Sequence, residues 1–350
     1  MQYRWFAISG EFEFSDAISF KGKIVEQGAL PVQSDKETLP EESFSRPPIV
    51  PAVGVALCDQ RFSDGKITAT IEFVGEINET DGCELVLAYD VETNRQISAG
   101  IVGANWAMYS IREWTGNGRE SRGEVPRWVP YAVGGDRANL KPGRRYQLEA
   151  RIFGSRVTLH IDGVHVASAN LPSTWQGAQQ VGVWCMSPGN VTVSNFTVTS
   201  DKPRAFVVMQ FSETYNEVYS EVIREVCKGY RVQVVRADEM YGPGIIISDI
   251  VEQIETSSLV IADVTPQNTN VYFEVGYAHA LKKPIVLLAR RGTQLPFDLA
   301  AFRVLFYEDS IGGKGKLEEG LRSHISAILG EEPQQVPGSQ SLNQPSAEPR

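Results

Sequence analysis

Residues 258–281 read SLVIADVTPQNTNVYFEVGYAHAL, and this stretch decides how the second half of the chain folds. The segment Ser258–Ala262 is an almost unbroken apolar run, which is typical of a parallel strand buried on both faces. A polar turn follows the run, and from Val271 to Leu281 apolar residues recur at helical spacing. The stretch therefore predicts one strand–turn–helix unit of a parallel sheet.

The same alternation of apolar runs and helical patterns continues from about residue 204 to residue 330. The predicted strands are Ala205–Phe211, Arg231–Val235, Ser258–Ala262, Pro284–Ala289 and Arg303–Tyr307. The predicted helices are Glu213–Lys228, Ile246–Thr256, Val271–Leu281 and Leu317–Leu329. This order indicates an α/β domain with a flavodoxin-like parallel sheet and helices on both faces. Ligands of such sheets bind at the carboxyl ends of the strands.

Before residue 200 the pattern is that of an all-β domain. Asp162-Gly163 joins two runs of alternating residues, Arg156–Ile161 and Val164–Ala169, which is a strong hairpin signal. Further short strands are predicted at Lys66–Val74, Glu84–Tyr89, Tyr146–Ile152, Gln180–Met186 and Val191–Val198. Many short strands with glycine-rich turns and no convincing helix predict a sandwich or jelly roll.

The two patterns meet near Thr199–Arg204, so we expect two domains. Their predicted bounds are residues 1–199 for the jelly roll and residues 204–330 for the α/β domain. Residues 331–350 contain four prolines and no aromatic residue, so they lack the material for a core and are predicted to be a disordered tail.

Composition and charge exclude several functional classes. The net charge of −10 argues against a groove for long nucleic acids, because phosphate binding uses a basic surface. The four cysteines are not in CxxC spacing, so no zinc site is expected and the thiols are predicted to be reduced. Glu11 and Glu13 interrupt the apolar run that a signal peptide needs, and no run is long enough to span a bilayer. We therefore expect a cytoplasmic protein without a membrane segment.

Candidate site residues follow the predicted strands. They are Met209, Gln210, Phe211 and Tyr215 after the first strand, Asp238 after the second, Asp263 after the third, Asn270, Glu274 and Tyr277 on the next helix, and Arg290 after the fourth. Two carboxylates, Asp263 and Glu274, beside polar and aromatic groups suit cleavage of an N-glycosidic bond. One carboxylate can stabilise or trap the sugar carbon while another group orients the ribose hydroxyls.

Each candidate also has a structural alternative. Glu274 is a solvated helix residue in one interpretation, although Phe273 and Val275 beside it predict an apolar setting. Asp263 is compatible with a turn or cap, and Asn270 with the N-cap of its helix. Tyr215 and Tyr277 are compatible with packing. Arg290 and Arg291 are compatible with two neighbouring solvated arginines, and Arg290 also with phosphate contact.

The second half of the chain resembles a known family. FVVMQFSETYNEVY at 206–219, VIADVTPQNTNVYFEVGYAHAL at 260–281, KKPIVLLAR at 282–290 and LPFDL at 295–299 resemble the nucleoside 2-deoxyribosyltransferase-like family and the related TIR-like domains. The resemblance implies a nucleoside- or nucleotide-binding fold with Glu274 as the catalytic carboxylate and Asp263 as a sugar-binding residue. Gln210 stands where that family often has proline. Several relatives cleave NAD or transfer deoxyribose, and many TIR-like relatives act in bacterial antiphage defence.

The first half resembles the concanavalin A-like (LamG-like) jelly-roll superfamily. The resemblance rests on RRYQLEARIFGSRVTLHIDGVHVASANL at 144–171 and GAQQVGVWCMSPGNVTVSNFTV at 177–198. It implies a fold, and it leaves open whether the ligand is a glycan or a protein. Core packing is predicted for most of Trp106, Trp114, Trp128, Trp175 and Trp184. The long segment Trp114–Tyr131, with Arg119, Arg122 and Arg127, is a candidate binding loop.

Three functional hypotheses follow. The first is an N-glycosidase or (deoxy)ribosyltransferase that takes a nucleoside, a nucleotide or NAD as substrate, requires no cofactor and carries a jelly-roll recognition domain. The second is a module that senses a nucleotide without cleaving it, and the third is a carbohydrate-binding protein in which the jelly roll dominates. Assembly into a homo-oligomer is compatible with all three.

Overall fold

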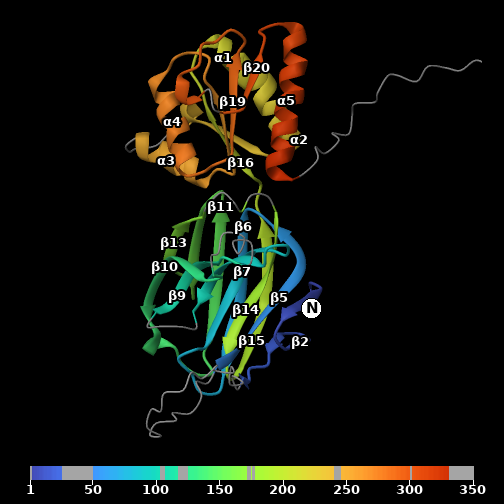
Figure 1. The fold of residues 1–350 in the computed structure, drawn as a ribbon, viewed down its shortest axis with the longest axis vertical. Coiled ribbons are helices and arrows are strands. Elements are labelled where there is room, and N and C mark those ends of the chain that lie inside the picture. Colours follow the sequence, from blue (N-terminus) through green and yellow to red (C-terminus); the bar gives the residue numbers. More distant parts are fainter. Residues whose placement is uncertain are drawn as a thin grey trace, which may run out of the picture.

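The computed structural model describes residues 2–25, 50–102, 107–116, 125–171, 175, 178–239, 246–299 and 302–330. Within them an antiparallel β-sandwich is followed by a parallel sheet with helices (Figure 1), which confirms the predicted fold class. The predicted tail at 331–350, Trp106, and Arg119 and Arg122 of the candidate loop lie outside the described residues. No described helix is both long and apolar enough to cross a membrane.

Two antiparallel sheets form the sandwich. One has the strand order β1-β5-β14-β7-β8-β9-β10, with β4 paired to β5, and the other has the order β13-β12-β11-β6-β15-β3-β2. The strands are β1 Trp5–Ser9, β2 Phe12–Phe14, β3 Ile18–Phe20, β4 Ile24–Val25, β5 Val50–Phe62, β6 Gly65–Val74, β7 Gly82–Asp90, β8 Arg95–Ile101, β9 Ala107–Trp114, β10 Trp128–Asp136, β11 Arg145–Phe153, β12 Arg156–Ile161, β13 Val164–Asn170, β14 Gln179–Ser187 and β15 Asn190–Ser200. A short 3-10 helix, η2, covers Arg137–Asn139.

Alternation of side chains builds the core of the sandwich. In β11 every second residue is buried, and Leu148 and Ala150 face Ala69 and Ile67 of the neighbouring β6. These residues belong to one large apolar cluster between the two sheets. Such period-two burial is what the sequence pattern of this region predicts.

The opposite face of the first sheet is also buried, and it carries polar as well as apolar side chains. Glu84 is 0% exposed and accepts hydrogen bonds from the Arg112 guanidinium and from the Ser110 hydroxyl, at 2.8–3.0 Å. The Arg112 guanidinium carbon lies 3.8 Å from the ring centre of Trp128 and 4.7 Å from that of Trp184. These two tryptophans therefore pack around a buried ion pair.

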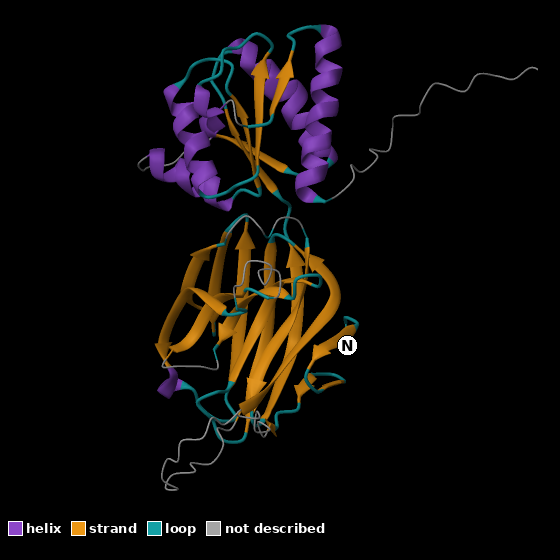
Figure 2. Cartoon of the chain, viewed as in Figure 1, coloured by secondary structure: helices purple, strands orange, loops and turns teal. Residues whose placement is uncertain are grey.

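The α/β domain has the strand order β17-β16-β18-β19-β20, with all neighbours parallel. Numbered within the domain, this is the order 2-1-3-4-5 of flavodoxin-like sheets, as predicted. Its strands are β16 Arg204–Val208, β17 Gln233–Arg236, β18 Leu259–Asp263, β19 Ile285–Arg290 and β20 Val304–Tyr307. Figure 2 shows these strands enclosed by helices, in contrast to the nearly helix-free sandwich.

Helices cover both faces of the parallel sheet. On one face Val222, Leu321 and other residues of the first and last helices pack against Val207 and Ile261. On the other face α3 and α4 pack against the alternate residues of the same strands. The helices are α1 Glu213–Val218, a π-helical turn η3 Tyr219–Ile223, α2 Arg224–Gly229, α3 Ile246–Thr256, α4 Thr269–Ala280 and α5 Ile311–Leu329, with 3-10 turns η4 Ala237–Glu239 and η5 Phe297–Leu299.

Buried polar groups join the two domains. Asp64 of the β5–β6 turn accepts hydrogen bonds from the Gly154 backbone N–H, at 2.6 Å, and from the Ser258 hydroxyl of the α/β domain, at 3.0 Å. Gly154 has a φ of +59°, and a Cβ there would lie 2.1 Å from the Ser257 carbonyl oxygen. The Lys283 ammonium donates to the carbonyl oxygens of Glu255 and Ser257 beside this turn. The two domains therefore meet through specific contacts at the amino ends of the parallel strands.

Candidate functional site

The carboxyl edge of the parallel sheet is where the candidate residues are placed. The adjacent strands β16 and β18 end at Val208 and Asp263, and the segments that follow them lead to helices on opposite faces of the sheet. Ligands of open α/β sheets bind where two connections diverge in this way. The site is therefore built from the segment after β16 and from the turn and helix after β18.

Asp263 is held by three hydrogen bonds from its own domain. Thr265 donates its backbone N–H and its hydroxyl to Oδ1 at 2.9 and 2.5 Å, and the Tyr307 hydroxyl donates to Oδ2 at 2.7 Å. The side chain is 1% exposed, and this burial raises its pKa although the hydrogen bonds oppose the shift. This geometry fits the structural alternative of a turn, because the Asp263 carboxylate accepts a hydrogen bond from the backbone N–H two residues ahead.

Tyr215 and Arg290 lie near this carboxylate, on the same face of the sheet. Burial and the negative charge of Asp263 raise the pKa of Tyr215, whereas the charge of Arg290 lowers it. The Arg290 guanidinium contacts Asp309 through Nη2 at 2.9 Å, while its buried Nε has no hydrogen-bond partner. The structure thus brings Tyr215, Asp263 and Arg290 together, and Arg290 also forms an ion pair with Asp309.

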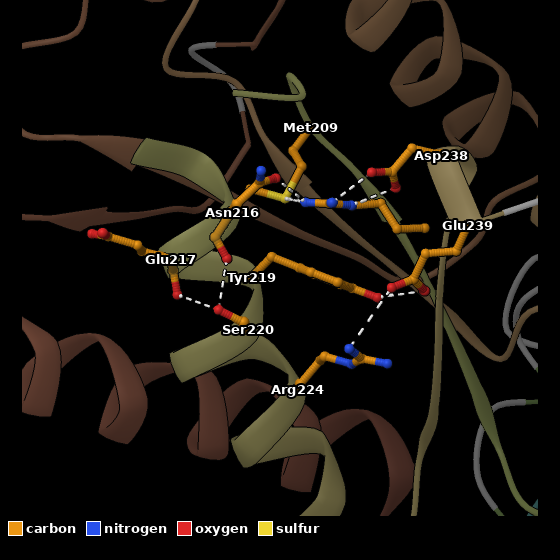
Figure 3. A network of polar contacts seen from close by, with 9 residues as sticks. Met209, Asn216, Glu217, Tyr219, Ser220, Arg224, Asp238 and Glu239 are labelled. Atoms are coloured by element: carbon orange, nitrogen blue, oxygen red, sulfur yellow. Dashed lines mark hydrogen bonds and ion pairs between the residues drawn. The ribbon is translucent and has the colours of Figure 1, made fainter. Parts of the chain in front are cut away.

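A second group surrounds Arg236 at the end of β17 (Figure 3). The guanidinium donates to both carboxylate oxygens of Asp238 at 2.6 Å and to Oδ1 of Asn216 at 2.8 Å. It also lies 4.0 Å from the Met209 sulfur and has its carbon 5.4 Å from the ring centre of Phe211. Arg236 is 6% exposed, so it is a fixed anchor for the segment after β16.

The same network extends along the first helical segment. The Tyr219 ring lies 4.2 Å from the Arg236 guanidinium carbon, and its hydroxyl donates to Glu239 at 2.8 Å. Glu239 also pairs with Arg224 at 3.8 Å, as Figure 3 shows. Of the predicted residues, Met209, Phe211 and Asp238 therefore gather around Arg236.

Glu274 stands apart from both groups. It lies on α4, on the face of the sheet opposite the Asp263 side chain, and it is 8% exposed. Within the described part of the chain, no hydrogen bond or ion pair reaches its carboxylate. Burial alone raises the pKa of Glu274 to about 7, and no other charge contributes. The predicted apolar setting is present, and the two predicted carboxylates are not neighbours.

The remaining predicted residues have different environments. Gln210 is half-buried one residue after Met209, and Asn270 is exposed at the start of α4. The N-cap of α4 is Asn268, whose side chain accepts from the Asn270 N–H, so the cap alternative for Asn270 is wrong. The Tyr277 hydroxyl donates to Glu255 at the end of α3, at 3.0 Å, near the amino ends of the strands.

The arrangement can supply a buried carboxylate, an ordered polar turn and exposed aromatic rings. Phe211 and Phe273 are 52% and 50% exposed. Groups of three or more metal-binding side chains are absent from the described residues. Tyr307 and Thr265 were missed by sequence reasoning, and neither carried a signal in the sequence.

Comparisons with known proteins add distant structural similarities. No protein-family model matches the chain, and no curated protein sequence matches it. The carbohydrate-binding module CBM66 from Bacillus subtilis is similar over 55% of this chain and 93% of its own, with 12% identity and a TM-score of 0.39. A β-glucanase from Bacillus licheniformis covers 55% of this chain and 89% of its own, with 11% identity and a TM-score of 0.32.

A 2-deoxyribosyltransferase from Bacillus psychrosaccharolyticus is also similar. It covers 38% of this chain and 99% of its own, with 14% identity and a TM-score of 0.30. The similar structures thus include proteins of both kinds that the sequence resembles.

Proposed function

We propose that the α/β domain cleaves the N-glycosidic bond of a nucleoside or nucleotide, with Glu274 as the catalytic carboxylate. The observation that carries this proposal is the isolation of Glu274, which is buried and has no donor among the described residues. Burying such a group is costly, and groups with shifted pKa values concentrate at functional sites. The sequence resemblance implies the same residue.

The chemistry would proceed through the sugar carbon that carries the base. As the bond from this carbon to the base nitrogen breaks, its electron pair leaves with the base, and positive charge develops on the sugar. The ionised Glu274 carboxylate stabilises this charge or bonds to the carbon as an ester. Water or a second base then attacks the same carbon, the carboxylate is released unchanged, and the proton that the nucleophile loses goes to the departed base.

The other residues would bind and orient the substrate. Phe211, held beside Arg236, offers an exposed ring on which a base can stack. Tyr215 and Arg290, which lie near Asp263, would bind sugar or phosphate oxygens. A sugar-binding role for Asp263 stays a prediction, because protein donors already occupy both of its oxygens.

The test is release of free base from a panel of deoxynucleosides, nucleotides and NAD, with and without an acceptor base. Glu274→Gln keeps the size of the side chain and should slow turnover on the order of 100-fold or more. Glu252→Gln makes the same change at an exposed position of the adjacent helix α3 and should have no effect. Equal rates for the parent and Glu274→Gln would remove the catalytic assignment.

The same panel separates the enzyme from the sensing module. Saturable binding of a nucleotide without any base release would favour the sensor. In either case we propose that the jelly roll recruits the target, a glycan or a protein, and takes no part in bond cleavage. NAD as the substrate and a role in antiphage defence stay predictions.

A further inference from the structure

A groove of about 290 Å³ lies at one side of the sandwich, away from the α/β domain. Its walls come from the start of the chain, from the β2–β3 turn and from β15. This volume lies at the lower end of the range of about 300–1,000 Å³ that is usual for small-molecule sites. The groove is independent of Glu274 and of the proposed reaction.

Aromatic rings form part of the groove. Trp5 and Tyr3 are half-buried, and both meet the buried Phe196 edge-on, with ring centres 4.8 and 5.9 Å apart. Phe14 continues the aromatic surface beyond Trp5, at 6.3 Å and nearly parallel. Rings fixed in this way present apolar faces at little entropic cost when a ligand binds.

Three polar side chains of the groove have no partners of their own. Gln2, Asp16 and Asn195 line it and are exposed, and within the described residues none of these side chains makes a hydrogen bond or ion pair. Together they offer two amides and a carboxylate, which are both donors and acceptors.

The backbone is irregular at the same place. The pairing of β15 with β6 shifts between Ser194 and Thr197, and Asn195 has a φ of +52°. A bulge of this kind re-aims side chains, and bulges are common next to functional sites. Here the bulge places Asn195 beside Phe196 in the wall of the groove.

We propose that this groove, formed by Trp5, Tyr3, Asp16, Asn195 and Gln2, is a carbohydrate-binding site. A pyranose ring has apolar C–H faces that fit an aromatic surface, and hydroxyl groups that need both donors and acceptors around its edge. The groove supplies both kinds of contact. A purely apolar ligand would displace water from these three polar side chains without replacing its hydrogen bonds, and a nucleotide phosphate would face the Asp16 carboxylate.

The test uses the full chain and observes the Trp5 indole N–H by NMR, assigned from its loss in Trp5→Phe. Cellohexaose, laminarihexaose, xylohexaose and maltohexaose are titrated separately. At least one should shift this resonance saturably. Trp5→Ala lacks this resonance, so its binding is measured by isothermal titration calorimetry and should be weakened roughly 30-fold, as for other buried aromatic contacts. Asp16→Ala should weaken it about two- to tenfold, as expected for one lost hydrogen bond.

Matched variants guard against misfolding and indirect effects. Asn195→Gly keeps the backbone, because glycine accepts the positive φ, and should also weaken binding about two- to tenfold. Phe6→Ala removes a 71% exposed ring from the adjacent position of β1 and should leave binding unchanged, as should Glu274→Gln.

Three results would overturn the proposal. The first is that none of the four saccharides shifts the Trp5 resonance. The second is that Phe6→Ala weakens binding as much as Asn195→Gly does. The third is that choline shifts the resonance while the saccharides do not. Choline is the relevant probe because its quaternary ammonium group binds aromatic rings and is attracted by a carboxylate.

Discussion

The hydroxyl oxygen of Tyr307 lies 2.7 Å from Oδ2 of Asp263, and it donates a hydrogen bond to a carboxylate that is 1% exposed. The bond connects the ends of β18 and β20 across the intervening strand β19. Asp263 therefore connects two strands of the sheet, and any role in substrate binding would come in addition to this structural role.

Tyr307→Phe tests the structural role of Asp263. It removes one donor from a buried carboxylate and should lower the free energy of unfolding by about 1–3 kcal/mol. Urea unfolding at neutral pH measures the change. If stability is unchanged while the KM for the cleaved substrate rises, the pair acts in substrate binding instead.

The rate of base release should depend on the ionisation of Glu274. Burial raises its pKa to about 7, and the ionised form is the one that stabilises the sugar cation. The value of kcat/KM should therefore rise about tenfold per pH unit below pH 7 and level off above it. Initial rates across this range measure the profile. A rate that falls through the same range would show that the protonated acid is the working form.

Glu274 should lower the free energy of unfolding at alkaline pH. Unfolding returns Glu274 to its ordinary pKa of 4.5, so between pH 4.5 and about 7 the folded state binds the extra proton and loses stability as the pH rises. Above this range the loss reaches about 3 kcal/mol. Glu274→Gln should therefore be more stable than the parent near pH 8 and similar to it near pH 4, by urea unfolding. Equal stabilities near pH 8 would contradict the raised pKa.

Arg236→Lys should disturb substrate binding more than turnover. The guanidinium bonds Asp238 twice and Asn216 once, and a lysine ammonium cannot reproduce this fork. We expect KM to rise roughly tenfold with a smaller change in kcat, because the segment after β16 loses its anchor. Arg224→Lys, in the same network but with a half-exposed side chain, is the control and should behave like the parent. A loss confined to kcat would place Arg236 closer to the reacting atoms.

The joint between the domains should depend on Asp64. Asp64→Ala leaves the Gly154 N–H and the Ser258 hydroxyl unpaired and should destabilise the joint by about 2 kcal/mol. Limited proteolysis should then cut faster near the predicted boundary at Thr199–Arg204. Asp201→Ala removes a nearby exposed carboxylate and serves as the control. Unchanged cleavage would mean that other contacts hold the domains together.

Much of the α/β domain could be predicted because its patterns are strong. Helix α3 has the predicted bounds, and every predicted strand was found within a few residues. The first strand ends at Val208, three residues before the predicted end, because its pairing with β18 stops there. Helix α5 begins at Ile311, six residues before the predicted start. Its first turns are rich in glycine and hide the helical pattern, and Gly313 is needed because a Cβ would lie 2.1 Å from the Glu308 carbonyl oxygen.

Other features had no usable signal in the sequence. The π-helical turn at Tyr219–Ile223 interrupts what looked like one helix. Strand β8, which was not among the predicted strands, is buried on both faces, and its polar Gln96 and Ser98 alternate with the apolar Ile97 and Ala99. At the site, the buried and apolar setting of Glu274 could be predicted from its neighbours. Its separation from Asp263 could not, because it depends on which face of the sheet each element occupies.

Helix α4, which carries Glu274, is also connected to the sandwich through one residue of α3, Glu255. Tyr277 bonds to Glu255, and Glu255 pairs at 3.5 Å with Arg156 of the first domain. A chimera that joins a different sandwich to this α/β domain must therefore also keep the turn before Arg156. In natural variants, substitutions at positions 156 and 255 should be inherited together, as charge-compensating pairs.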